Sequence, residues 1–340
     1  MTPVSAGAPT VSVAAIVVGT NERAWLPECL TTLCTASSEP SVSLRVYYVD
    51  NASADGSLEY VRQHHADVVT IRNSTNIGFA AANNVGIRAA LEAGADHVFL
   101  VNPDTSTPPD LVRRLARFML DHPGYAIVGP MQWVFNLGEP VQPELNEWSK
   151  AAIADGEQHV LVRDLPTLRP HREPDVQRAS GTLEFAYVQG AAFYARSAAL
   201  RQIGLFDDAY HTFYEEVDLC RRARLAGWRV ALVTGLGIGH HGGGGTAGTV
   251  YRRRQMARNK YYFLATDVEI PLGAGARIAL RWLGRDIRGR GIGGQSSVPV
   301  AVAETAATGW WLLGRARAIA GRRAGDRALL ATGSDRVTPA

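Results

Sequence analysis

Five short apolar runs, each followed by an amphipathic segment, dominate the first part of the chain and constrain its fold more than any other feature. The runs span residues 11–18, 44–49, 68–71, 98–101 and 126–128. A strand that is apolar along its whole length is covered on both faces, which is typical of a parallel sheet packed between helices. The intervening segments carry apolar residues at helical spacing, as Leu26, Leu30 and Leu33 do. The sequence therefore predicts an α/β fold with a doubly wound, mostly parallel sheet.

Composition sets the broad class of protein. With 340 residues, 46% hydrophobic and 20% charged, the chain can bury the core of one large domain plus an appendage. A net charge of +3 gives no reason to expect a nucleic-acid partner. The three cysteines, Cys29, Cys34 and Cys220, lack metal-ligand spacing and read as reduced core residues. We find no secretory signal and no long uninterrupted apolar run, so we expect a cytoplasmic location.

The later part of the chain is less regular. Residues 136–180 lack the alternation of strands and helices, and we expect them to form a long irregular excursion from the sheet. Regularity returns at Phe185 to Tyr194, a strand-like run that contains Gly190 and Ala191, where a glycine lets a ligand approach the backbone. We expect a further strand at 230–234 and a helix at 251–264.

The corner after the fourth apolar run places a carboxylate where a ligand would bind. Val98 to Val101 leads directly into Asn102-Pro103-Asp104. In open α/β sheets, ligands bind just beyond the carboxyl ends of the strands. A carboxylate there suits a hard divalent cation, which in turn neutralises a diphosphate. Asn, Pro and Asp are also common turn formers, so these residues alone leave both interpretations open.

Three acids crowd the start of a predicted helix that ends near Gly227. Glu215, Glu216 and Asp218 could simply stabilise the helix N-terminus, with Asp218 pairing with Arg222 one turn later. Alternatively, one acid is a general base, because like charges in a partly buried cluster raise one pKa toward the useful range.

Two further stretches carry polar side chains suited to a nucleotide or a metal. His240 and His241 precede four glycines, which indicates either a loop that folds over a metal-bound diphosphate or a flexible surface loop. Asp50 and Asn51 end the second apolar run, where an acid can bind a nucleoside or form an ordinary turn. A GxGxxG fingerprint is missing after the first run, which argues against a nicotinamide or flavin enzyme.

Taken together, these stretches resemble family 2 glycosyltransferases with the GT-A fold, and among them bacterial rhamnosyltransferase-like enzymes that act on cell-surface polysaccharides. The resemblance covers about residues 11 to 265. Its motifs occur in the family's order: Asp50 to Ser57, Asn76 to Ala80, Asn102 to Asp104, Gly190-Ala191, Gly204 to Asp207, Glu215 to Arg222, and the His240-His241 loop.

The resemblance implies an inverting transfer of a sugar from a nucleoside diphosphate to a hydroxyl of a glycan or lipid-linked acceptor. The donor it suggests first is dTDP-L-rhamnose, followed by UDP-sugars, with Mg²⁺ or Mn²⁺ as the cofactor. Glu216 or its neighbour Glu215 would be the base, with Asp218 as a third candidate. Asp104 would be the last acid of the metal-binding DxD-type motif.

One histidine of the His240-His241 pair would be a metal or diphosphate ligand, and its spacing to Gly244 and Thr246 favours His241. The residues expected to contact the nucleotide sugar are Thr20, Asn21, Glu22, Asp50, Asn51, Asn76, Gly78, Phe79, Asn83, Asn102, Asp104, Gly190 and Ala191. The chain departs from the family pattern at a few sites: Thr20 replaces a usual Tyr, Asn102 replaces the first acid of DxD, Glu216 stands where Asp is more usual, and the histidine loop has an extra glycine.

We expect a catalytic domain over 11–265, with a nucleotide-sugar half at 11–135 and an acceptor and catalytic half at 181–265. Residues 266–331 form a basic amphipathic tail rich in arginine and tryptophan. Such a tail suits the anionic inner face of the cell membrane, although helices packed on the catalytic domain with a solvated arginine face would look the same. Residues 1–10 are expected to be a loose leader and 332–340 to be disordered.

Two other functions compete with sugar transfer. A nucleotidyltransferase would be expected to carry a glycine- and lysine-rich loop after the first strand, and Gly19 to Arg23 is not such a loop. A non-catalytic nucleotide-sugar or glycan-binding module would not need both Asp104 and the acids at 215–218. The sugar, the acceptor, the linkage and the oligomeric state are left open by the sequence.

Overall fold

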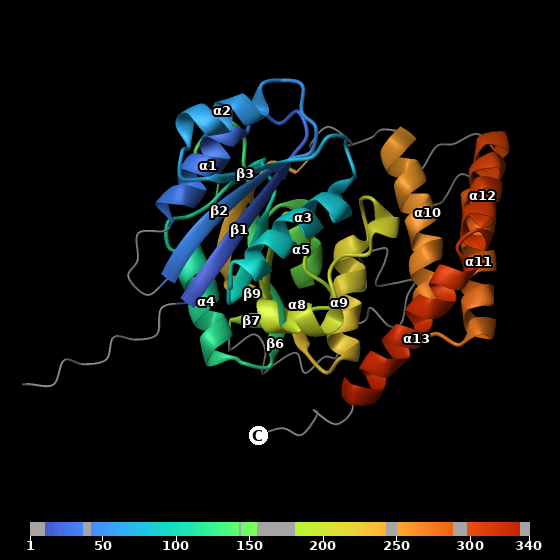
Figure 1. Cartoon of the computed structure of the whole chain (residues 1–340). Coiled ribbons are helices and arrows are strands. Elements are labelled where there is room, and N and C mark those ends of the chain that lie inside the picture. The colour runs from blue at the N-terminus through green and yellow to red at the C-terminus, as the bar shows by residue number, and fades with distance from the viewer. Residues whose placement is uncertain are drawn as a thin grey trace, which may run out of the picture.

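The computed structural model describes residues 11–36, 42–142, 144–154, 181–242, 250–287 and 298–333. Within these residues, nine strands form one mixed sheet flanked by helices (Figure 1). Its order is β3 (Val69–Arg72), β2 (Val42–Asp50), β1 (Val11–Gly19), β4 (His97–Val101), β8 (Ala192–Arg196), β6 (Tyr125–Val134), β9 (Arg229–His240) and β5 (Thr105–Ser106), with β7 (Thr182–Glu184) also paired to β9. The leader 1–10, much of the excursion 136–180, Gly243 to Thr246 and the end from 334 lie outside the described residues.

The N-terminal half of the sheet is parallel, as its continuous apolar runs predict. Strands β3, β2, β1 and β4 are all parallel neighbours. Alternate β1 residues enter two cores, with Ile16 on one face and Val17 on the other. Helices α1 (Leu26–Thr35), α2 (Ser57–His64) and α4 (Leu111–Asp121) cover one face, whereas α3 (Phe79–Glu92), α8 (Ser197–Ile203) and α9 (Glu215–Leu225) cover the other. The doubly wound arrangement is thereby confirmed.

The centre of the sheet differs from the expectation of parallel strands. Strand β8 lies antiparallel between β4 and β6. It begins at Ala192, so the strand expected over 185–194 is wrong in its first part, and Gly190 and Ala191 lie in the preceding turn. The residues from Phe185 onward are apolar because they are buried in a loop, and burial leaves the same sequence pattern as a strand.

The capping of α4 differs from what the local sequence predicts, because Thr107-Pro108-Pro109-Asp110 has the pattern of an N-cap residue followed by proline and an acid before a helix from Leu111. The helix begins at Leu111 after Asp110, which makes no capping hydrogen bond through its side chain. Thr107 is buried instead, and its backbone N–H donates to Thr32 Oγ1 at 3.1 Å. Tertiary packing has therefore overridden a local capping signal.

The remaining helices are α5 (Glu147–Ala154), the short 3₁₀ helix η2 (Asp208–Tyr210), α10 (Val250–Thr266), α11 (Leu272–Ile287), α12 (Val298–Leu313) and α13 (Ala316–Gly333). The last four stand together beside the sheet, and α13 packs on α9 (Figure 1). Among the described residues, no helix combines the length and apolarity needed to cross a membrane.

Candidate active site

The polar corners expected from the sequence meet at one edge of the sheet. The backbone N–H of Asn51, after β2, donates to the Gly19 carbonyl at the end of β1, at 2.9 Å. The Asn51 side chain reaches the next corner, where its Nδ2 donates to Asn76 Oδ1 at 2.9 Å. Its Oδ1 accepts from Asn73 Nδ2 and from the backbone N–H of Ile77, both at 3.1 Å. Asn51 therefore connects three corners of the edge, and its side-chain amide makes three hydrogen bonds in doing so.

Asp50 is fully buried next to Asn51. Its Oδ1 accepts from the backbone N–H of Ser53 at 3.4 Å, and its Oδ2 lies 3.9 Å from Arg72 Nε. No hydrogen-bond donor within the described part of the chain reaches Oδ2. A buried carboxylate oxygen without a donor is costly, so Asp50 retains an acceptor that a ligand N–H could satisfy.

The loops of this edge are held in an unusual backbone conformation. Five non-glycine residues in the described ranges have positive φ: Asn21 (57°), Ala52 (65°), His211 (62°), Phe213 (67°) and Tyr214 (77°). All five lie in loops at this edge or directly before the acids of α9. Each such residue costs on the order of 1 kcal/mol or more, and such strain clusters at ligand sites.

Asn259 of α10 holds the strained loop in front of α9. It is fully buried, and its Nδ2 donates to the carbonyls of Tyr210 (2.9 Å), Thr212 (2.7 Å) and Phe213 (2.7 Å). From the other side, the loop accepts a hydrogen bond at the His211 carbonyl from the backbone N–H of Ala80, at 3.0 Å. The acids of α9 are thereby fixed against the corner at residues 76–80.

Glu215 and Glu216 begin α9 directly after this loop. Glu215 is 3% exposed, whereas Glu216 is partly exposed. In each side chain Oε2 is buried and meets no hydrogen-bond partner among the described residues. Burial raises the pKa of Glu216 to about 7, and burial together with the charge of Glu216 raises the pKa of Glu215 well above its ordinary value. Of the two, Glu216 is the carboxyl group that a ligand can reach, because its side chain is the partly exposed one.

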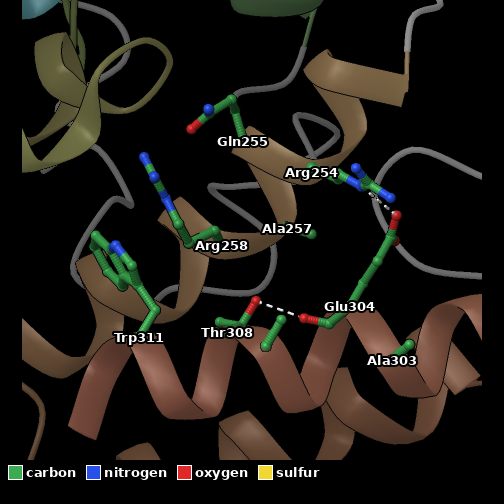
Figure 2. A pocket seen from close by; sticks show the side chains of 9 residues that line it. Arg254, Gln255, Ala257, Arg258, Ala303, Glu304, Thr308 and Trp311 are labelled. Atoms are coloured by element: carbon green, nitrogen blue, oxygen red, sulfur yellow. Dashed lines mark hydrogen bonds and ion pairs between the residues drawn. The ribbon is translucent and has the colours of Figure 1, made fainter. Parts of the chain in front are cut away.

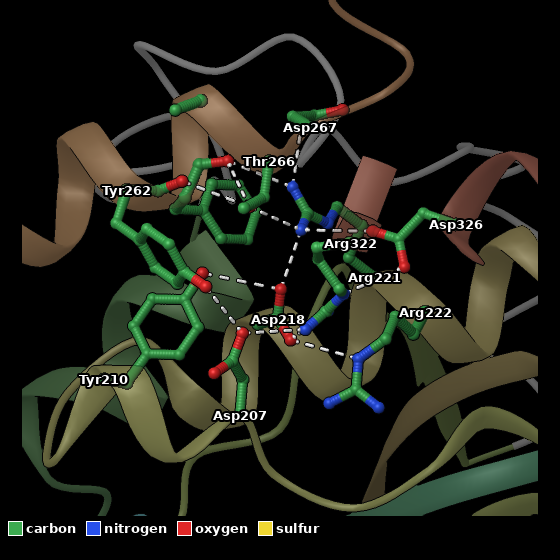
Figure 3. A network of polar contacts seen from close by, with 12 residues as sticks. Asp207, Tyr210, Asp218, Arg221, Arg222, Tyr262, Thr266, Asp267, Arg322 and Asp326 are labelled. Atoms are coloured by element: carbon green, nitrogen blue, oxygen red, sulfur yellow. Dashed lines mark hydrogen bonds and ion pairs between the residues drawn. The ribbon is translucent and has the colours of Figure 1, made fainter. Parts of the chain in front are cut away.

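Asp218 has the opposite environment (Figure 3). Its Oδ1 accepts from Arg221 Nη2 at 2.7 Å, and its Oδ2 accepts from Arg222 Nε at 3.0 Å and Arg322 Nη2 at 2.6 Å. Burial alone would raise the pKa of Asp218, but Arg322, Arg222 and Arg221 outweigh it and hold that pKa well below the usual range. The expected i,i+4 pair of Asp218 with Arg222 is present. Asp218 is a fully paired buried anion, which suits a structural role.

Asp104 contacts one of the two histidines. Asp104 Oδ1 lies 3.4 Å from His240 Nε2, and both side chains are about 8% exposed. The two residues are held by the pairing of β5 with β9, in which Thr105 is opposite His240. Burial alone would raise the pKa of Asp104, but the hydrogen bond and charge of His240 lower it overall.

A chain of amides fixes how the His240 ring is turned. The backbone N–H of Ser149 donates to Asn146 Oδ1 at 2.9 Å, so Asn146 Nδ2 is the group that donates to Gln132 Oε1, also at 2.9 Å. Gln132 Oε1 lies 2.8 Å from His240 Nδ1 and can only accept there. Nδ1 therefore carries a proton, and Nε2 is the ring nitrogen that faces Asp104.

His241 contacts Asp104 through its backbone, because its N–H donates to the Asp104 carbonyl at 3.1 Å, whereas the side chain that faces the Asp104 carboxylate is that of His240. The geometry therefore favours His240 as the ligand, while the spacing to the glycines favours His241. It is exposed, its Nδ1 lies 3.1 Å from the Phe135 carbonyl, and its ring lies 4.6 Å from the ring of Trp25. Successive residues of a strand point to opposite faces, which separates His240 from His241.

A divalent cation would find two oriented ligands here, Asp104 and His240, rather than a closed cage. In the described ranges, no three His, Cys, Asp or Glu side chains are grouped so that they could hold a metal ion. A further carboxyl group, that of Glu22, lies near Asp104. Burial and the negative charges of Asp104 and Asp55 raise the pKa of Glu22 to about 7. These residues fit a hard cation that completes its shell with water and diphosphate oxygens.

The other expected contacts line the same edge or support it. The backbone N–H of Asn102 donates to the Ala191 carbonyl at 3.0 Å, which places the turn before β8 beside Asp104. Gly78 has a φ of 88°, and a Cβ there would collide with the His211 ring. Phe79 lies 3.5 Å from where a Cβ of Gly190 would be.

Thr20 and Asn21 contact the corner that follows β2. Asn83 lies within α3. Thr20 Oγ1 is 3.5 Å from the Asn51 carbonyl, and Asn21 Oδ1 accepts from the backbone N–H of Ala54 at 2.8 Å. Asn83 is buried, and its Nδ2 donates to the Phe79 carbonyl at 2.9 Å. The edge therefore brings together the expected residues from four separate corners of the chain.

Several residues that shape the site carry no motif. Asn84 bonds both the carbonyl and the N–H of Phe206 through its amide, at 2.9 and 3.0 Å, and so fixes the turn before η2. Asn84, Asn259 and Gln132 are amide side chains at positions of helices or strands that face the core. An amide at such a position was the one sequence feature that could have pointed to them. Their partners are distant in sequence, so the signal could not be assigned to a site.

Comparison with known proteins matches the chain to one family. A family model described as "Glycosyltransferase like family 2" matches residues 9–261. The N-acetylglucosaminyl-diphospho-decaprenol L-rhamnosyltransferase of Mycobacterium tuberculosis is 25% identical over 228 residues, which cover 64% of this chain and 71% of that protein. The undecaprenyl-phosphate 4-deoxy-4-formamido-L-arabinose transferase of Aeromonas hydrophila is 32% identical over 117 residues, which cover 33% of this chain and 34% of that protein.

Solved structures show the same fold. The mannosyltransferase PcManGT from Pyrobaculum calidifontis, in complex with GDP-Man and Mn²⁺, superposes with a TM-score of 0.55 at 15% identity, covering 98% of this chain and 90% of that one. TarS of S. aureus superposes with a TM-score of 0.51 at 14% identity, covering 82% of this chain and 44% of that one. The fold is GT-A, and the chain belongs to glycosyltransferase family 2.

Proposed function

We propose that this enzyme transfers a sugar, with L-rhamnose the first candidate, from a nucleoside diphosphate to a hydroxyl of a lipid-linked glycan, with inversion at the anomeric carbon. The observation that carries the proposal is the contrast among the acids of α9. Glu216 is reachable, lacks a hydrogen bond on one oxygen and has a raised pKa, whereas Asp218 is locked in ion pairs.

Each residue then has a role in a single displacement. The Glu216 carboxylate takes the proton of the acceptor hydroxyl, and the acceptor oxygen bonds to the anomeric carbon. The bond from that carbon to the diphosphate breaks on the opposite face, and its electron pair leaves with the nucleoside diphosphate. Asp50 offers its free acceptor oxygen to the nucleobase. Glu215 is buried beside Glu216, where burial and the charge of Glu216 raise the pKa of Glu215.

A divalent ion held by Asp104 and His240 would supply neutralisation of the leaving diphosphate. Support comes from the orientation of His240 Nε2 toward Asp104 and from the Mn²⁺ in the PcManGT complex. The rhamnose assignment is supported by the name of the Mycobacterium tuberculosis relative. Lipid linkage is supported by the names of that relative and of the Aeromonas hydrophila transferase.

We further propose that the C-terminal helices contact the membrane that carries such an acceptor. Exposed apolar side chains gather on them: Leu272 is 75% exposed, Leu280 66%, Trp310 75% and Leu313 68%. The exposed arginines Arg277 and Arg281 on α11 suit anionic headgroups around these side chains. Other arginines of this region face inward, as Arg322 does toward Asp218, so part of the basic tail packs on the catalytic domain.

Binding and turnover with purified full-length protein test the proposed function. Calorimetry with dTDP, UDP and GDP, each with and without Mn²⁺, should find one metal-dependent ligand whose binding is lost in Asp104→Ala. Release of that diphosphate from its sugar donor should be lost in Glu216→Gln and retained in Glu215→Gln. Wild-type turnover in Glu216→Gln would move the base to Glu215, and the absence of any diphosphate binding would refute the transferase assignment.

A further inference from the structure

We propose that the groove between α10 and α12 binds the isoprenoid phosphate end of the acceptor, which deepens the proposed function and rests on it. The groove encloses about 520 Å³ between the two helices. In Figure 2, Arg254 and Arg258 rise from α10 on one side, and Glu304 and Trp311 rise from α12 on the other. A ligand with an anionic group on a long apolar chain fits this lining, because the chain can pack on the alanines and Trp311 and the anion can bind the arginines.

The walls of the groove are apolar, and the alanines in them are small enough to leave room for a ligand. Ala303, Ala307 and Trp311 follow one another at a spacing of four along α12, so they share one face of that helix. Ala257 faces them from α10. Ala303 and Ala307 are exposed, so the hollow between the helices opens to solvent along this side. An unbranched or isoprenoid chain can lie in such a groove and bury its carbons against alanine and tryptophan.

Positive charge surrounds the groove. The guanidinium carbons of Arg258 and Arg315 lie 4.6 and 4.1 Å from the centre of the Trp311 ring, so two cations approach one aromatic side chain. Glu304 is the carboxylate of the lining, and it is paired with Arg254 through Oε1 and Nε at 3.1 Å. Two lining arginines and Arg315 thus face one carboxylate, which leaves an excess of positive charge for a phosphate.

The groove also adjoins the loop that leads to the acids of α9. Arg258 Nη2 donates to the carbonyls of Ala209 (3.2 Å) and Tyr210 (2.7 Å), directly before the strained loop that leads to Glu215. Tyr251, one turn before the lining residue Gln255, has its pKa raised by burial and, to a lesser extent, by the charge of Glu215. A sugar attached to a phosphate in the groove could therefore present its hydroxyl toward the acids of α9.

The α12 side of the groove continues into exposed apolar side chains, which suggests where the rest of the lipid would go. Trp310 and Leu313 lie next to Trp311 and Thr308 on α12 and are 75% and 68% exposed. Exposed tryptophan and leucine beside arginine are suited to a membrane surface. The lipid would leave the groove along this helix and enter the bilayer there.

The test uses farnesyl diphosphate as the isoprenoid probe and inorganic pyrophosphate as the headgroup probe, both titrated into the full-length protein with the nucleotide site saturated by dTDP. We expect farnesyl diphosphate to bind at least about tenfold more tightly than pyrophosphate, because its chain buries apolar surface. Ala307→Trp, which fills the groove from an exposed position, should weaken farnesyl diphosphate at least about tenfold. Arg254→Gln should weaken both probes, whereas Arg117→Gln, which changes an exposed arginine of α4, should weaken neither.

Three results would overturn the proposal: equal affinity for the two probes, unchanged binding in Ala307→Trp, or displacement of farnesyl diphosphate by dTDP. Equally tight, Ala307-dependent binding of phosphatidylglycerol vesicles would also overturn it, since the groove would then recognise bulk anionic lipid. The proposed function fails by a different result, because turnover in Glu216→Gln does not depend on the groove.

Discussion

Replacing Arg322 with methionine removes the cation that joins α13 to α9. Arg322 donates to Asp207 Oδ2 at 2.9 Å, to Asp218 Oδ2 at 2.6 Å and to Asp326 Oδ1 at 3.0 Å, and its side chain is 18% exposed. An exposed ion pair contributes about 0–1 kcal/mol. Removing one partner of a buried ionic group costs about 3–5 kcal/mol, because the remaining charges lose their compensation.

The lower end of that range applies here, since Arg221 and Arg222 still contact Asp218 in the variant. We therefore expect Arg322→Met to lower the free energy of unfolding by about 3 kcal/mol. The matched control is Arg317→Met, which removes an exposed arginine from the same helix and should change it by less than about 0.5 kcal/mol. Urea unfolding followed by tryptophan fluorescence measures both, and a slope of about 3 kcal/mol per molar urea converts the loss into a midpoint shift of about 1 M. If the two variants unfold at the same urea concentration, the cluster does not stabilise the fold as we reason.

Three further predictions follow from the charges of the site. The value of kcat/KM should rise with pH through about 7 as Glu216 loses its proton, and a profile that is flat between pH 5 and 9 would contradict the assigned base. Gln132→Ala should weaken Mn²⁺ binding, followed by electron paramagnetic resonance, by about 10–100-fold, and Gln132→Glu, which keeps the acceptor for His240 Nδ1, should restore most of it. Asp218 has a lowered folded-state pKa, so its stabilisation is complete above its ordinary pKa of 3.8 and is lost as the pH falls below it; Asp218→Asn should flatten this acid limb of the stability profile.

The sheet and its active edge could be predicted because both follow from local patterns. Continuous apolar runs require cover on both faces, and polar corners after parallel strands meet at one edge. Asp104 and Glu216 could be picked out for the same reason, since each directly follows or begins a regular element. The expected strand at 185–194 was wrong in its first part, because a buried loop and a strand share one apolar pattern.

What could not be predicted depends on partners far apart in the sequence. The side chain of His240, rather than that of His241, faces the Asp104 carboxylate because β9 pairs with β5, and the spacing to the glycines contains no information about that pairing. Gln132 and Asn259 act on segments 108 and about 46–49 residues away, respectively. Arg322 looked like one basic residue among many until α13 was placed on α9.

The position of Arg322 has a consequence for the order in which the chain can mature. Asp207 and Asp218 are synthesised more than a hundred residues before the arginine that compensates them. Until α13 is made, Asp218 relies on Arg221 and Arg222 alone, and the acidic helix lacks part of its final counter-charge. The sheet precedes α13 in synthesis, but Asp207 and Asp218 gain their last counter-charge only when α13 docks. The final helix therefore completes an ion-pair cluster that the catalytic domain cannot complete by itself.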